Sequence, residues 1–158
     1  MTRKGWTVEK ETHDPYLHKE KYSDPSVCES CNVVFTKGMY KWKKVIPENA
    51  SKIICPACQR IKDNFEGGYL ILAGNFLSEH KEEILNLVKH TEQIEKDKKP
   101  LERIMEINDK GNRVEIRTTY EHLPRIIGTA IQKAYKGDLD FNYPDGDKFI
   151  RAYWIREN

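Results

Sequence analysis

Four cysteines stand in two pairs of identical spacing, Cys28-Glu-Ser-Cys31 and Cys55-Pro-Ala-Cys58, with 23 residues between the pairs. A tetrahedral metal ion needs four converging ligands, and each C-x2-C pair forms a tight turn whose backbone amides can also donate to the sulfurs. Asn32 follows the first pair, and asparagine tolerates the left-handed conformation that such a turn often requires. The spacing therefore predicts one Zn2+ ion held by Cys28, Cys31, Cys55 and Cys58.

Other uses of these cysteines fit the sequence less well. A disulfide framework is disfavoured because we expect a cytosolic protein, and the cytosol keeps thiols reduced. His13 and His18 are further potential ligands, but they lie in a polar segment where histidines are usually solvated. Rubredoxin-like iron sites share the four-sulfur geometry and also contain Cys-Pro-x-Cys, so a small iron electron carrier stays open as an alternative. Zinc is favoured because four closed thiolate ligands commonly serve structural zinc.

A metal ion with four protein ligands has no open position for water, so we expect it to stabilise structure rather than to act as a Lewis acid. Elsewhere, Glu121 and His122 follow two threonines, but no nucleophile elbow, phosphate loop or paired-carboxylate motif accompanies them. Capping and packing explain this cluster better than catalysis does. The sequence therefore predicts no catalytic residues and no enzymatic activity.

Cations alternate with aromatic rings from Met39 to Lys44, and residues 32–54 carry five lysines against one acid. Such a basic finger suits contact with RNA phosphates and stacking on RNA bases. The candidate RNA-binding residues in this stretch are Lys41, Trp42, Lys43 and Lys44. The alternative is that the aromatic rings pack a small core while the lysines are merely solvated.

A second group of candidates lies on two expected strands of the C-terminal half. Polar and aromatic side chains alternate there with aliphatic ones, so they share one face of a sheet whose other face helices would cover. RNA-binding domains of this architecture bind bases on the open face. The candidates are Arg113, Arg117, Arg151 and Tyr153. A simply solvated face is the competing interpretation, because Glu115 lies among them and the signature of an RNA-recognition motif is missing.

Periodicity and charge divide the chain into three parts. Residues 1–27 show neither a strand nor a helix period, which indicates an extended arm. Residues 28–66 carry seven cations against four anions and contain a hairpin pattern between the cysteine pairs, which together indicate a zinc ribbon. Residues 67–158 alternate short apolar stretches with amphipathic ones and form an α+β domain.

The element order expected for this domain is β-α-β-β-α-β. Ser78 is a good N-cap for the first helix, which Pro100 ends, while Pro124 is expected to weaken or displace the first turn of the second helix. Gly111 provides the turn of the hairpin between the helices. The expected strands span residues 69–73, 101–108, 113–118 and 149–155. This order is that of the ferredoxin-like split βαβ fold, in which two helices cover one face of a four-stranded antiparallel sheet.

Composition excludes several classes of protein. Of 158 residues, 33% are charged and 38% hydrophobic, which excludes wholesale disorder and collagenous or coiled-coil chains. No apolar stretch approaches the about 20 residues that span a bilayer, and the first residues lack the apolar core of a signal peptide, so we expect a cytoplasmic protein without membrane contact. Four thiolates and one divalent cation bring the formal charge of +2 to about zero. Affinity for a polyanion must therefore come from local charge distribution.

Several segments are similar to one known family: CPACQRIKD, GGYLILAGNF, PLERIMEI, TTYEHLPRIIGTAI, AYKGDLDFNY and RAYWIR. Over residues 14–156 they resemble a family of small prokaryotic zinc proteins. That family is related to the N-terminal portion of the archaeal and eukaryotic export adapter of the large ribosomal subunit, the one named for nonsense-mediated decay. The resemblance implies metal binding by the four cysteines and association with ribosomes or ribosomal RNA, without enzymatic activity. The adapter is much longer, so its role in export is not carried over, and Pro124 departs from the helix-friendly residue usual at that position.

The leading hypothesis is a non-enzymatic zinc protein that associates with ribosomes or RNA. The main alternative is a protein-protein adapter, in which the ribbon and a sheet edge dock a partner polypeptide. The iron electron carrier is the third hypothesis. None of these patterns specifies an oligomeric state.

Overall fold

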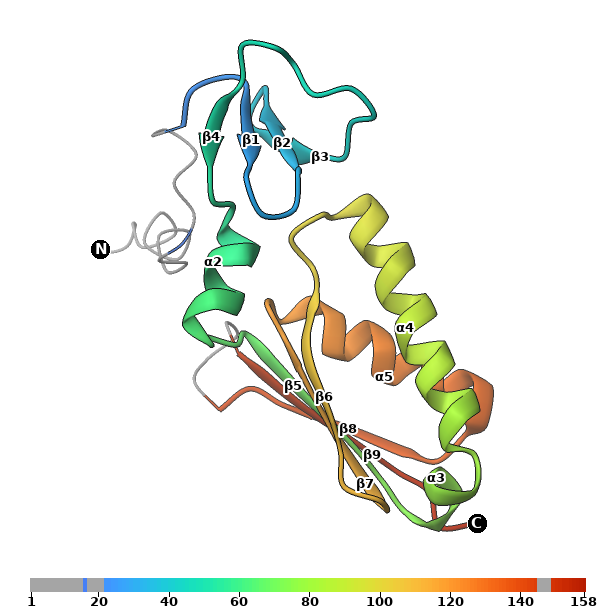
Figure 1. Cartoon of the computed structure of the whole chain (residues 1–158). Coiled ribbons are helices and arrows are strands. Elements are labelled where there is room, and N and C mark those ends of the chain that lie inside the picture. The colour runs from blue at the N-terminus through green and yellow to red at the C-terminus, as the bar shows by residue number, and fades with distance from the viewer. Residues whose placement is uncertain (1–15, 17–21, 145–148) are drawn as a thin grey trace, which may run out of the picture.

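The computed structural model describes residues 16, 22–144 and 149–158 of the chain. A small four-stranded sheet is followed by helix α2 (Pro56–Asp63) and then by a five-stranded sheet with helices on one face (Figure 1). The small sheet lies beyond the C-terminal end of α4 (Lys81–Lys98), whereas the C-terminus of the chain lies near the other end of that helix (Figure 1). The predicted α+β class, with a cysteine-bearing module before a larger domain, is confirmed.

The small sheet has the strand order β3-β2-β1-β4. Its strands are β1 (Ser26–Cys28), β2 (Val34–Thr36), β3 (Met39–Lys41) and β4 (Ser51–Ile53). The predicted hairpin is β2 and β3, whose turn contains Lys37 and Gly38, both with positive φ. Strand β3 ends at Lys41, so the alternation expected as far as Lys44 does not continue through Trp42. Strand β1 begins at Ser26, inside the segment predicted as the arm, most of which lies outside the described residues.

Helix α2 follows directly from the second cysteine pair and was not expected from the sequence. Cys55 is its N-cap and Pro56 occupies its first turn. Proline is tolerated there because the N–H groups of the first turn have no hydrogen-bond partner within the helix. Asn64 ends the helix in the left-handed conformation, with φ of 57°. The cysteine pair thus doubles as the start of a helix, which fixes the direction of the chain as it leaves the sheet.

The large sheet has the strand order β6-β7-β5-β9-β8. Its strands are β5 (Gly68–Ala73), β6 (Ile104–Asp109), β7 (Arg113–Thr118), β8 (Asp138–Asn142) and β9 (Ile150–Ile155). The βαββαβ pattern is present, but the sheet differs from the expected four antiparallel strands in two respects. Strand β8 is additional, and β9 lies between β5 and β8 and runs parallel to β5, so the sheet is mixed. We call these strands and their helices the large-sheet domain, and the small sheet with α2 the ribbon.

Among its described residues, the large-sheet domain has three helices: α3 (Asn75–Glu79), α4 and α5 (His122–Tyr135). The prediction of Ser78 as an N-cap is wrong, because Ser78 lies within α3 and His80 precedes α4. Pro124 does not displace the start of α5, because it is the third helical residue and the first-turn N–H groups have no intrahelical partner. No helix in the described ranges combines the length and apolar character needed to cross a lipid bilayer.

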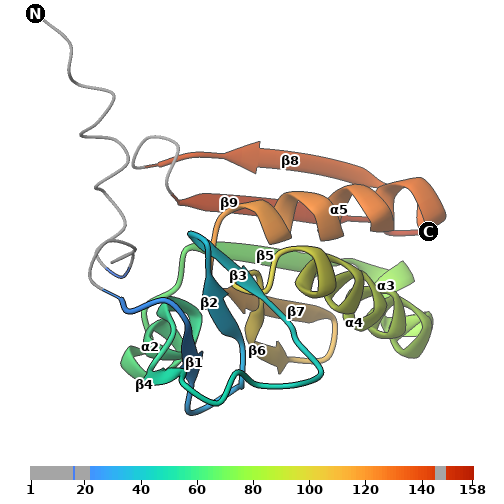
Figure 2. The same ribbon diagram turned by 90° about the horizontal axis from the view of Figure 1, so that it is seen from above.

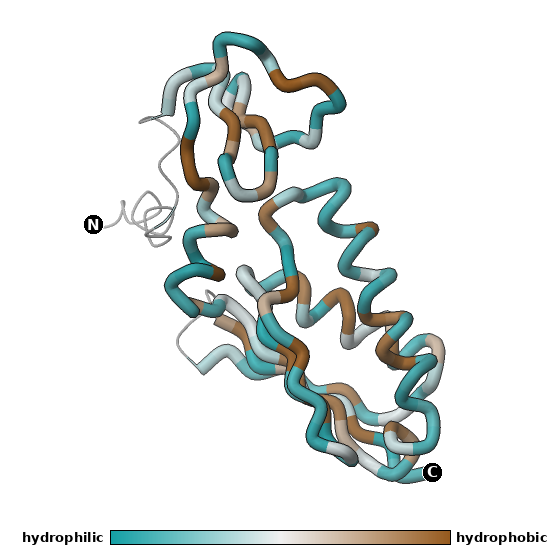
Figure 3. Tube along the Cα trace, viewed as in Figure 1, coloured by the Kyte–Doolittle hydropathy of each residue, from teal (hydrophilic) through white to brown (hydrophobic). Residues whose placement is uncertain are grey.

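Helices α4 and α5 lie on the same side of the large sheet, as two perpendicular views show (Figures 1 and 2). Apolar residues gather where these helices face the strands (Figure 3). The core between them contains Leu70, Leu72, Ile84, Val88, Ile116, Ile127, Ile131 and Trp154. The ribbon has a separate core around Cys28, Val33, Cys55 and Ala57, and Leu101 of the large-sheet domain packs against it.

Candidate metal centre

The four cysteines come from three short elements of the ribbon. Cys28 ends β1, Cys31 lies in the turn that follows, and Cys55 and Cys58 lie at the start of α2. Asn32 has the predicted left-handed conformation, with φ of 71°. The backbone N–H of Cys55 donates to Cys28 Sγ at 3.3 Å, and that of Cys58 donates to Cys55 Sγ at 3.4 Å. Such N–H···S bonds stabilise the thiolate form that a metal ion requires.

The sulfur atoms have the separation of a tetrahedral site. All four Sγ atoms lie within 4.8 Å of one another, and Cys31 Sγ and Cys55 Sγ are 3.8 Å apart. Metal–sulfur bonds of about 2.3 Å place the corners of a tetrahedron about 3.8 Å apart. The cysteines therefore form a cluster that fits one metal ion, as the sequence predicts.

The protons of the cluster are shared unequally among the sulfurs. A hydrogen bond from Cys31 lowers the pKa of Cys28 far below its ordinary value, whereas the pKa of Cys55 is raised, chiefly by its hydrogen bond to Cys28. Sulfurs this close cannot all be ionised unless a cation lies among them, because like charges repel strongly at such distances. A divalent ion is the group that would let all four become thiolates.

Arg103 of the large-sheet domain places its guanidinium against three of the four sulfurs. Its Nη1 donates to Cys58 Sγ at 3.2 Å, and its Nη2 donates to Cys31 Sγ at 3.1 Å and to Cys55 Sγ at 3.6 Å. The residue is only 6% exposed. Burial alone would lower the pKa of Arg103, but the neighbouring sulfurs raise it above its usual range, so the guanidinium is charged. Arg103 was not among the site residues predicted from the sequence.

The main chain holds Arg103 firmly at the start of β6. Its N–H donates to the hydroxyl of Thr119 at 3.0 Å, and the N–H of Thr119 donates back to the carbonyl of Arg103 at 2.9 Å. Its side-chain Nε donates to the carbonyl of Pro100 at 2.8 Å. Thr119, one of the two threonines in the cluster predicted to serve capping and packing, therefore fixes the cation that faces the cysteines.

Trp42 joins the ribbon to the last turn of α4. Its indole Nε1 donates to the carbonyl of Lys96 at 2.8 Å. The charged ends of Lys96 and Arg103 lie 5.9 Å and 5.5 Å from the centre of its ring. The ring is half-buried and packs against the ribbon core, a position that favours the core role over base stacking.

The contact through Trp42 brings two groups of lysines to one end of the molecule. Lysines of the ribbon flank Trp42, while those of α4 lie at the end of the helix that Trp42 touches. We call these six residues the basic surface: Lys41, Lys43, Lys44, Lys96, Lys98 and Lys99. Five of them are exposed, and Lys98 lies 3.5 Å from Glu95. The lysines at the end of α4 were not among the RNA-binding residues predicted from the sequence.

The four sheet candidates lie on the face of the large sheet that the helices leave open. Two of the candidates lie on β7 and two on β9, and strand β5 lies between these strands. Tyr69 of β5 lies between Arg117 and Arg151. Arg117 is ion-paired with Glu106 at 2.6 Å and Glu66 at 3.0 Å, and Arg113 with Glu115 at 3.0 Å. Arg151 and Tyr153 are exposed on β9. The structure does not bring these residues together with the basic surface, and the pairing of Arg113 and Arg117 with carboxylates favours a solvated face.

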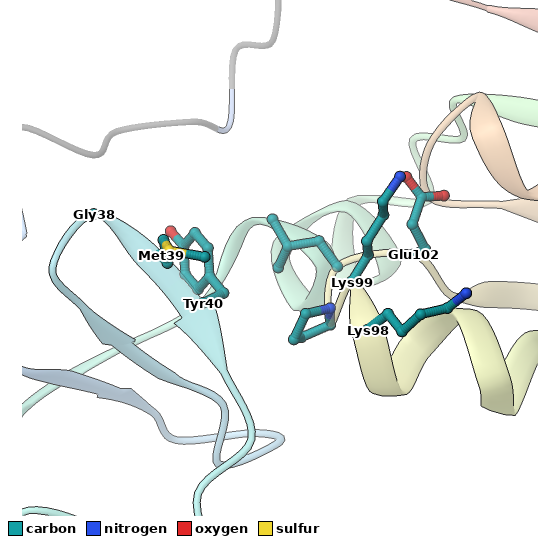
Figure 4. Close-up of a pocket in the computed structure, with 8 residues that line it drawn as sticks. Gly38, Met39, Tyr40, Lys98, Lys99 and Glu102 are labelled. Carbon is teal, nitrogen blue, oxygen red and sulfur yellow. The ribbon is translucent and has the colours of Figure 1, made fainter.

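A cavity of about 290 Å³ separates β3 from the end of α4. Met39 and Tyr40 lie on its ribbon side, and Lys98, Lys99 and Glu102 on its other side (Figure 4). Glu102 is 6% exposed, and its Oε1 is buried with no hydrogen-bond partner among the described residues. Burial raises the pKa of Glu102 to about 7, assisted by the charge of Glu121 and opposed by that of Lys99.

We expect replacement of this carboxyl, Glu102→Gln, to stabilise the protein at high pH. The folded-state pKa is raised, so the favourable contribution is complete below the unfolded pKa of about 4.5 and is lost as pH rises through about 7. At pH 8 the folded wild type contains an ionised, buried carboxylate, and removing it gains about 2–3 kcal/mol. Urea unfolding should show this gain at pH 8 and little difference at pH 4, where the carboxyl is largely protonated in both the folded and the unfolded state. An equal effect at both pH values would contradict the assignment.

Comparisons with protein-family models, with curated proteins and with solved structures found no match to this chain. The class that the fold and the site define is an α+β protein with a four-cysteine metal-binding module. The resemblance to the ribosomal export adapter stays a prediction.

Proposed function

We propose that the four cysteines bind one zinc ion whose role is structural. The cluster supplies four sulfur ligands, so no coordination position is left for water or substrate. The ribbon core consists of few residues, and modules of this size commonly depend on a metal ion for folding. Elemental analysis of purified protein should give one zinc per chain and a colourless solution. Visible absorbance from iron–thiolate bonds would instead identify the bound metal as iron and would favour the electron-carrier hypothesis.

We further propose that the protein is a non-enzymatic, RNA-binding protein that associates with the ribosome. The observation that supports this most is the basic surface, in which lysines from the ribbon and from the end of α4 lie at one end of the molecule. The metal-loaded chain is close to neutral overall, so its net charge does not attract phosphates. The attraction has to come from the lysines that are clustered on this surface. The family resemblance supports ribosomal RNA as the target.

The direct test replaces three lysines of the basic surface in one variant, Lys41→Gln, Lys43→Gln and Lys44→Gln. We expect its affinity for ribosomal RNA to fall and the salt dependence of log K to drop by about 2–3 units, near one for each lost phosphate contact. Stability should hardly change, since exposed lysines contribute little to folding. Fluorescence titrations at several salt concentrations measure both quantities.

A matched control removes three exposed lysines from other surfaces, Lys62→Gln, Lys89→Gln and Lys133→Gln. It changes the net charge equally, so only the position of the charges differs between the variants. An equal loss of RNA affinity in both variants would show that net charge alone, and not the position of the lysines, determines binding. Normal binding by the basic-surface variant would leave the open sheet face, with Arg151 and Tyr153, as the remaining RNA site.

The protein-protein adapter is the second candidate, and the open sheet face is the observation that favours it. Tyr153 is 43% and Ile155 42% exposed there, next to paired arginines and carboxylates. Apolar side chains among balanced charges suit a protein partner better than a polyanion. If Tyr153→Ser abolishes capture of a defined partner while RNA binding is absent in the wild type, the adapter hypothesis replaces the first.

A further inference from the structure

The contact between Arg103 and the cysteines joins two parts of the chain that have separate cores. Arg103 belongs to the large-sheet domain, and the sulfurs that it touches belong to the ribbon. Among the described side chains, it supplies the cation in hydrogen-bonding contact with the cluster. A buried guanidinium is costly unless an anion faces it.

The proposed metal centre provides that anion. Four thiolates around one divalent ion leave a net charge of about −2, which is spread over the sulfurs. The fork of the guanidinium reaches three sulfurs at once, a geometry that a lysine ammonium could not reproduce. Without the ion, the four closely spaced sulfurs cannot all be ionised, so less negative charge would face the buried guanidinium. The negatively charged metal centre and the positively charged Arg103 side chain therefore stabilise each other.

We propose that the metal–thiolate centre is itself the ligand by which the large-sheet domain holds the ribbon, with Arg103 as the positioning residue. This inference rests on the proposed zinc site. Metal binding then does more than fold the ribbon: it sets the ribbon's position on the end of α4, where Trp42 meets Lys96. The two halves of the basic surface lie side by side only in that position.

The first measurement is zinc affinity by competition with a chromophoric chelator. Arg103→Ala should weaken zinc binding by about 10- to 100-fold, the usual effect of removing a group that hydrogen-bonds to metal ligands. Arg103→Lys should recover part of the loss, because it restores the charge but not the fork. Arg151→Ala, which removes an exposed arginine, should stay within about twofold of wild type.

The second measurement follows hydrogen exchange at two indole N–H groups in zinc-saturated protein. Trp42 Nε1 reports the ribbon–helix contact, whereas Trp154 Nε1, bonded to the carbonyl of Lys136 at 2.6 Å, reports the fold of the large-sheet domain alone. In Arg103→Ala, Trp42 should lose its protection while Trp154 keeps it. If Trp154 is also exposed, Arg103→Met carries the test instead, since it keeps the packing of the side-chain stem.

The outcomes separate this inference from the proposed function. Unchanged zinc affinity together with a protected Trp42 in the folded Arg103 variants would overturn the docking role and leave the zinc site intact. A wild-type protein that binds no zinc would overturn the zinc proposal, and this inference would fall with it. Weaker zinc binding with an exposed Trp42 and a protected Trp154 is the result that we expect.

Discussion

Replacing Cys55 by serine is expected to remove the metal ion and unfold the ribbon while the large-sheet domain stays folded. Cys55 is fully buried, and its sulfur accepts the N–H of Cys58 and lies within 4.8 Å of the other three sulfurs. A serine hydroxyl is a poor ligand for zinc, and structural zinc supplies about 10–16 kcal/mol to small modules. The large-sheet domain has its own core and does not need that contribution.

Two-dimensional NMR distinguishes the two parts in one spectrum. Signals of β1 to β4 should collapse in Cys55→Ser, and those of β5, β7 and β9 should persist. Ser30→Ala is the matched control, because Ser30 is exposed in the turn between Cys28 and Cys31 and should leave zinc binding unchanged. Simultaneous collapse of both sets of signals would mean that the chain folds as one unit.

Trp154→Ala is expected to cost about 3–5 kcal/mol of unfolding free energy in the large-sheet domain. The side chain is 1% exposed, packs in the core between sheet and helices, and donates to the carbonyl of Lys136. Alanine leaves a large cavity and an unpaired carbonyl, and the two effects add. Such a loss removes much of the stability of a domain of this size.

The neighbouring residue provides the control for this prediction. Tyr153 lies on the same strand but on the opposite face, where it is 43% exposed, so Tyr153→Ala should cost about 1 kcal/mol or less. Urea unfolding followed by circular dichroism measures both variants. Equal losses would show that the helices do not cover the face that carries Trp154.

Local patterns in the sequence were sufficient for the metal ligands and most elements. The fixed cysteine spacing identified the four ligands, and the alternation of aliphatic residues in Val114 to Ile116 and Ile150 to Trp154 identified the faces of two central strands. Strand β8 was missed because Asp138 and Asp140 are poor strand formers, and they are tolerated on an edge strand whose outer side is solvated.

The interactions that join the two parts could not be predicted from local patterns. Arg103 is 45 residues from Cys58 and 72 from Cys31, and no periodicity links an arginine to a thiol at such separations. The basic surface was only half predicted for the same reason. Lys96 and Lys98 were not among the predicted RNA-binding residues, because only the fold places the end of α4 near the ribbon.

Co-sedimentation of the zinc-loaded protein with ribosomes, at low and raised salt, tests the central claim most directly. We expect the protein in the ribosomal fractions at low salt and its release as salt rises, because phosphate contacts exchange with counterions. The variant without Lys41, Lys43 and Lys44 should be released at lower salt than the variant without Lys62, Lys89 and Lys133. Absence from ribosomal fractions at every salt concentration, with a defined protein partner recovered instead, would contradict the account.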